Sequence, residues 1–123
     1  MKNNIIQNKT YNFSLKVIQF YKYLIEEKKE YVLARQILRS GTSVGANIEE
    51  ALGAYSKKEF LSKITISYKE ARETVYWLRL FKDSMIVEGN FCDSMLSDCN
   101  EIIKIISSIQ RTLKESLGLN RNS

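Results

Sequence analysis

The fold of this chain depends on the segment ILRSGTSVGANI, residues 37–48. Its middle, residues 40–46, is rich in glycine and hydroxyl side chains, and each Gly costs a helix interior about 1 kcal/mol relative to Ala. The apolar and small positions nevertheless keep helical phase, at 37, 41, 44 and 48. We therefore predict one continuous helix in which small residues let a neighbouring backbone come close. The alternative is a loop with an anion-binding nest at Gly41–Gly45, although the spacing of a phosphate-binding loop is absent.

Three further helices are predicted around this segment, and no strand. Apolar residues recur every three or four positions along each of them. Residues 56–59, Ser-Lys-Lys-Glu, form a capping box that begins the third helix, and Gly118 stops the fourth. We expect helices at about 11–27, 31–54, 57–83 and 91–117, within a single domain spanning 1–123. Their lengths and short connections predict an all-α fold, an antiparallel up-down-up-down four-helix bundle.

Each expected helix carries an apolar stripe that should face the core of the bundle. The expected core positions are Phe13, Val17, Phe20, Tyr21, Leu24, Ile25, Leu33, Ile37, Val44, Ile48, Leu52, Phe60, Ile64, Ala71, Val75, Leu78, Phe91, Met95, Cys99, Ile102, Ile106, Ile109 and Leu113.

The composition excludes several kinds of chemistry. The 123 residues contain no His, which removes Ser–His and Cys–His catalysis, HExxH zinc sites and the Glu-x-x-His motif of di-iron bundles. Cys92 and Cys99 would lie about 10 Å apart along one helix, too far for a disulfide. We expect no metal, no cofactor and no enzymatic activity. No apolar run is long enough to span a membrane, and the N-terminus lacks a signal-peptide core, so a cytoplasmic location is expected.

A polar stripe accompanies the apolar one on the second helix. Arg39, Ser43, Asn47 and Glu50 follow one another at three- and four-residue steps, and the third helix carries Glu70, Glu73 and Trp77. Arg39 facing Glu50, Glu70 or Glu73 would form a charge-assisted network beside the core. We interpret this stripe as a structural network that sets helix register or an oligomer contact. A ligand site remains open, and for an enzyme Glu50 and Glu73 are the one plausible acid–base pair.

The other flank of the third helix is basic. Its members share one face at helical spacing and are candidates for nucleic-acid binding: Lys58, Lys69, Arg72, Tyr76 and Arg79. Cations displace counterions from a phosphate backbone, and an interleaved ring can stack on a base. The net charge of +5 makes the surface mildly basic without concentrating the charge. A solvated helix face is the competing interpretation.

Three runs of sequence resemble a known family: residues 39–51 (RSGTSVGANIEEA), 56–60 (SKKEF) and 69–78 (KEARETVYWL). They resemble the bacterial four-helix-bundle proteins often encoded in intervening sequences of 23S rRNA genes. The resemblance covers about residues 13–113, and Ala51 departs from it where many members have Gly. The family's hallmark polar positions fall on Arg39, Ser43, Asn47, Glu50 and Glu73, none of which is an established catalytic residue.

The resemblance implies an antiparallel four-helix bundle, a homopentameric ring and a largely unassigned function. It also implies a relation to accessory proteins of diversity-generating retroelements, which are basic pentamers that bind nucleic acid and a reverse transcriptase. A semi-polar flank with Trp77 beside the core stripe would suit subunit contacts. We therefore expect a non-enzymatic oligomer that binds RNA or a nucleic-acid–protein complex. The alternative is a protein-interaction scaffold with no nucleic-acid role.

Overall fold

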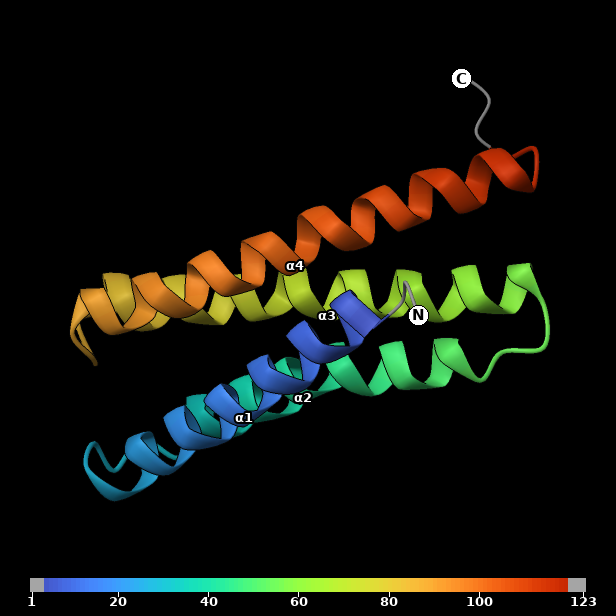
Figure 1. Cartoon of the computed structure of the whole chain (residues 1–123). Coiled ribbons are helices and arrows are strands. Elements are labelled where there is room, and N and C mark those ends of the chain that lie inside the picture. The colour runs from blue at the N-terminus through green and yellow to red at the C-terminus, as the bar shows by residue number, and fades with distance from the viewer. Residues whose placement is uncertain (1–3, 120–123) are drawn as a thin grey trace.

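The computed structural model describes residues 4–119, which form four α-helices (Figure 1). The helices are α1 (Asn4–Glu26), α2 (Val32–Leu52), α3 (Lys57–Asp83) and α4 (Gly89–Ser116). Consecutive helices pack side by side, and α1 also meets α4, so that α1 and α3 lie diagonally opposite. The predicted all-α up-down bundle is confirmed. Assembly into a ring stays a prediction.

Helix α2 runs unbroken through residues 37–48, so the prediction of a continuous helix is confirmed and the anion-binding loop is wrong. Both glycines lie against α1. A Cβ added to Gly41 would stand 2.7 Å from Cγ2 of Val17, and one added to Gly45 would stand 3.2 Å from the carbonyl oxygen of Thr10. The glycines are therefore present because α1 packs too closely for a side chain.

Helix α1 begins seven residues before the expected start at residue 11. Ile6 and Thr10 extend the stripe of Phe13 toward the N-terminus, and both are almost fully buried. The Thr10 hydroxyl is satisfied within the helix, because it donates to the carbonyl oxygen of Ile6 at 2.9 Å. Polar residues surround these two positions, and for this reason the sequence did not predict that the apolar stripe begins before residue 11. The other helix ends differ from the expected ones by at most two residues.

The capping residues act close to expectation. The Ser56 side chain accepts from the backbone N–H of Glu59 at 3.1 Å. Glu59 reaches back to the N–H of Tyr55 at 3.0 Å, one residue before the expected N–H of Ser56. At the end of α4, Gly118 has φ of 71°, and the N–H of Leu119 bonds the carbonyl of Lys114 at 2.7 Å. This left-handed glycine ends the helix as predicted.

Most of the expected core positions are buried, and an aromatic cluster closes the end of the core where α3 leads into α4. Phe20 meets Phe81 edge-on with ring centroids 5.3 Å apart, which ties α1 to its diagonal partner α3. Phe91 is 44% exposed, contrary to expectation, because its ring lies over Tyr23 on the outside of the cluster, with centroids 5.4 Å apart.

The seam between α1 and α4 differs from the other helix contacts, because no loop joins these two helices. Two ion pairs cross it, from Lys9 to Glu101 and from Lys16 to Asp98. All four side chains are partly exposed, so the first and last helices are held in part by charges in contact with solvent.

Candidate functional site

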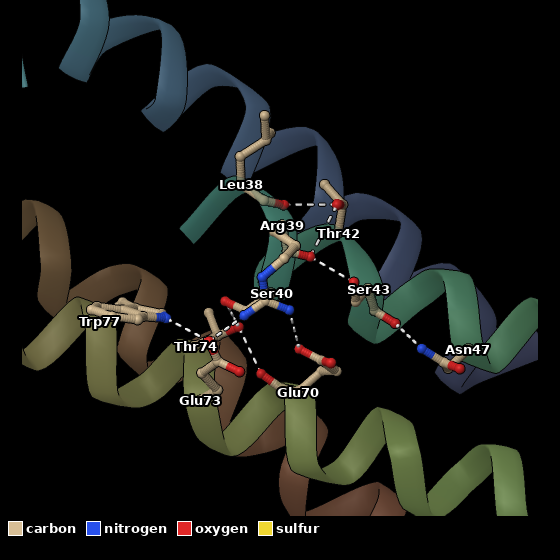
Figure 2. A network of polar contacts seen from close by, with 10 residues as sticks. All are labelled: Leu38, Arg39, Ser40, Thr42, Ser43, Asn47, Glu70, Glu73, Thr74 and Trp77. Atoms are coloured by element: carbon tan, nitrogen blue, oxygen red, sulfur yellow. Dashed lines mark hydrogen bonds and ion pairs between the residues drawn. The ribbon is translucent and has the colours of Figure 1, made fainter. Parts of the chain in front are cut away.

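One arginine of α2 joins two carboxylates of α3 (Figure 2). The Arg39 guanidinium donates to Glu70 at 3.3 Å and to Glu73, and the indole N–H of Trp77 donates to Glu73 at 2.9 Å. The Arg39 side chain is half exposed, and exposed ion pairs contribute at most about 1 kcal/mol each. The network therefore joins α2 to α3 while contributing little to the stability of the fold.

The remaining residues of the predicted polar stripe do not join this network. The Ser43 hydroxyl donates to the carbonyl of Arg39 at 2.6 Å, and the Asn47 amide donates to the carbonyl of Ser43 at 2.9 Å, both within α2. Glu50 pairs instead with Lys63 at 2.8 Å, and this hydrogen bond raises the pKa of Lys63. Because Glu50 and Glu73 belong to different ion pairs, the structure does not bring them together as an acid–base pair.

The sequence does not predict the buried hydroxyl groups that lie between α2 and α3. Ser67 donates to the carbonyl of Val44 at 2.7 Å. The Thr74 hydroxyl lies within hydrogen-bonding distance of the Ser40 hydroxyl, at 2.9 Å, and of the carbonyl oxygen of Glu70, at 2.8 Å. All three hydroxyl side chains are fully buried. One signal in the sequence could have predicted their burial. Ser67 and Thr74 are small residues four and three positions from Ala71, so they lie on the same helix face as this expected core residue.

We expect Thr74→Val to lower the free energy of unfolding by about 1–3 kcal/mol, because it leaves the buried Ser40 hydroxyl without its partner. Val has nearly the shape of Thr, so packing changes little. The double variant Ser40→Ala/Thr74→Val should recover part of the loss. Urea denaturation of the four proteins of this cycle measures the coupling. Strictly additive losses would show that the two hydroxyls do not depend on each other.

The basic flank of α3, which we define as Lys58, Lys69, Arg72, Tyr76 and Arg79, is exposed along its whole length. Within residues 4–119 none of its four cations forms an ion pair. By contrast, five other cations do: Lys9, Lys16, Arg39, Lys63 and Lys82. Arg72 leans on Tyr68, with its guanidinium 5.9 Å from the ring centre and 3.2 Å from the phenol oxygen. The four charges are thus available to an external anion.

The two cysteines are free and buried in α4. Burial raises the pKa of Cys92 to about 11 and that of Cys99 to about 12, so neither is a nucleophile at neutral pH. In the part of the chain that the structure describes, no group of His, Cys, Asp and Glu is arranged to hold a metal ion. None of the four described helices is long and apolar enough to cross a membrane.

The fold and the network define an up-down bundle whose second and third helices are joined by Arg39 and by buried hydroxyls. Residues 2–108 match the model of the family described as 23S rRNA-intervening sequence protein, and the chain belongs to this family. No curated protein matches it.

A solved structure is similar over most of this chain. It is described as the crystal structure of a protein with unknown function from the S23 ribosomal protein family of Bacteroides thetaiotaomicron. The two chains are 42% identical with a TM-score of 0.88, over 90% of this chain and 99% of the other. Neither comparison names a retroelement accessory protein, so that relation stays a prediction.

Proposed function

We propose that this protein is a non-enzymatic oligomeric bundle that binds RNA through the basic flank of α3. The observation that carries the proposal is the set of four exposed cations on one helix face, none of them paired within residues 4–119. Each cation that meets a phosphate releases condensed counterions, which favours binding and makes it sensitive to salt. Glu70 and Glu73 are both engaged by Arg39, so these three residues leave a net charge of −1 beside the four cations of the flank.

One chain offers few contacts, so the proposal includes a homo-oligomer, and the family resemblance implies five subunits. A pentamer of chains with charge +5 would carry 5 × 5 = +25. The basic flanks of several subunits would then bind the same RNA molecule. Once one flank is bound, the others meet the RNA at a high effective concentration, so the overall affinity exceeds that of a single flank. The same arrangement would apply to the accessory proteins of retroelements, the branch to which the resemblance implies a relation, because they are basic pentamers that bind nucleic acid.

The outer face of α1 suits contacts between subunits. Tyr11, Leu15 and Ile18 lie at four- and three-residue steps and are 62%, 44% and 38% exposed. Their apolar stripe faces away from the core stripe of α1, where an isolated bundle has no use for it. Trp77 is a second candidate contact, since it remains partly exposed beside the polar network.

We expect the double variant Arg72→Glu/Arg79→Glu to bind RNA at least tenfold more weakly and with a shallower salt dependence, because phosphate contacts are lost. The measurement is titration of nuclease-treated protein into labelled RNA at about 50 and about 200 mM salt. Its mass is read by light scattering in the same run. The matched control is Lys104→Glu/Arg111→Glu, two exposed cations of α4 with the same spacing and the same change in charge.

Equal losses in the two double variants would mean that only total charge matters, and the flank would then not be the binding site. An oligomer without RNA binding would favour the alternative, a protein-interaction scaffold. A partner recovered equally well with and without nuclease would identify that case. A monomeric mass would overturn the ring.

A further inference from the structure

Tyr76 is the one aromatic member of the basic flank, and it is 54% exposed. Arg72 precedes it by four residues and Arg79 follows it by three, so that one cation lies on each side of the ring along the same face. An aromatic ring exposed to this extent is not explained by the core of the bundle. The arrangement of cation, ring and cation offers an external partner one aromatic surface between two charges.

The ring of Tyr76 contacts the ring of the neighbouring Trp77. It meets Trp77 with centroids 5.1 Å apart and planes at 67°. The indole N–H of Trp77 is fixed on Glu73 at 2.9 Å, and Glu73 is held by Arg39 from α2 (Figure 2). The polar network thus fixes the Trp77 ring on which the exposed Tyr76 ring packs. This contact lowers the conformational entropy that the Tyr76 side chain would lose on binding.

We infer that Tyr76 is a stacking platform for an unpaired base, and that the flank takes single-stranded RNA in preference to an RNA duplex. This inference rests on the proposed function. In an RNA duplex each base is already stacked on its neighbours, and phosphates, 2′-hydroxyls and base edges face the protein, so no base face is open for stacking on the ring. On a single strand, a base can turn onto the ring while its flanking phosphates meet Arg72 and Arg79.

The ends of the flank set the scale of the ligand. Lys58 and Arg79 are 21 positions apart, which is about 31 Å along a helix. Lys58 and Lys69, together with Leu61, Ser62 and Thr65, line a shallow groove on the first half of α3. A strand of several nucleotides would pass from Tyr76 along this groove, with phosphates toward the lysines.

The test compares Tyr76→Ala with Tyr76→Phe and the wild-type protein. The probes are a single-stranded oligoadenylate of about twelve nucleotides and an RNA hairpin duplex with the same number of phosphates. We expect Tyr76→Ala to weaken single-strand binding roughly tenfold or more, because stacking on one base is lost. Tyr76→Phe should retain it, and duplex binding should not change. The salt slope should stay constant, since the ring carries no charge, whereas Arg72→Glu/Arg79→Glu lowers it.

Two residues of the chain provide a direct readout of binding and a control for this experiment. Trp77 is the only tryptophan in the sequence, so quenching of its fluorescence by the single strand reports binding beside Tyr76. Tyr55 is 97% exposed and far from the two arginines, so Tyr55→Ala is the control for loss of an exposed tyrosine.

The outcomes separate the inference from the proposed function. If Tyr76→Ala binds the single strand as tightly as wild type while the arginine variant fails, the flank binds RNA by charge alone and the platform is wrong. Equal wild-type affinity for hairpin and single strand would also overturn the preference. If wild type binds neither probe, the proposed function itself fails.

Discussion

Replacing Gly41 with leucine is expected to lower the free energy of unfolding by about 3 kcal/mol or more. A Cβ at this position would already lie 2.7 and 2.9 Å from the two γ carbons of Val17, well inside van der Waals contact. Val17 is fully buried, and its β-branched side chain has little rotamer freedom within a helix, so it cannot move aside. The gain of about 1 kcal/mol in helix propensity is smaller than this clash.

The measurement is chemical denaturation followed by circular dichroism. The matched control is Gly53→Leu at the C-cap position directly after α2, where a Cβ has its nearest neighbour at 3.7 Å and the residue is exposed. This control should change stability by less than about 1 kcal/mol. A Gly41→Leu protein as stable as wild type would show that α1 does not pack against α2 as described.

Truncation of Phe20 to alanine is the second large effect, with an expected loss of about 3–5 kcal/mol. The ring is 1% exposed and lies 5.3 Å from that of Phe81 and 5.5 Å from that of Phe91. Its removal leaves a cavity where α1, α3 and α4 meet, and it breaks the aromatic contact that joins the diagonal pair of helices. An edge-on aromatic pair adds about 0.5–1.5 kcal/mol beyond the area buried.

Thermal and urea unfolding of Phe20→Ala measure this loss. Ile18→Ala is the control, because Ile18 lies two residues away on the outer face of α1 and is 38% exposed. In a monomer this control should cost little. A loss in Ile18→Ala that grows as the protein is diluted would instead show that the outer face of α1 is buried in an oligomer.

The fold could be predicted from the sequence because the spacing of apolar residues is a stronger signal than the helix propensity of individual residues. In α2 the stripe stayed in phase through two glycines, and continuity of phase was the correct criterion. The early start of α1 was missed because Ile6 and Thr10 are surrounded by Asn, Gln and Lys, and their burial depends on α2 lying beside them. The predicted stripe included only hydrophobic residues, and the buried Thr10 was therefore not recognised as part of it.

The polar site was less predictable, because partner choice between helices depends on register. Arg39 could face any of three glutamates by helical spacing, and the packing of α2 on α3 selects Glu70 and Glu73. Glu50 lies three turns further along α2, beside Lys63. The buried pair of Ser40 and Thr74 follows from the same register, which one sequence does not specify.

The order of contacts in the bundle has a kinetic consequence. Three of the four helix contacts join neighbours in the chain, so they form by closing loops of a few residues, and chains of this kind fold in microseconds to milliseconds. The exception is the seam where Lys9 meets Glu101, because it brings together residues at opposite ends of the chain. Of the four helix contacts, this one closes the longest stretch of chain and therefore has the largest loop-closure entropy, and its ion pairs weaken as salt rises. Opening of this seam leaves α1 held only by α2 and α4 held only by α3, so each terminal helix loses one of its two neighbours while the contacts between consecutive helices remain.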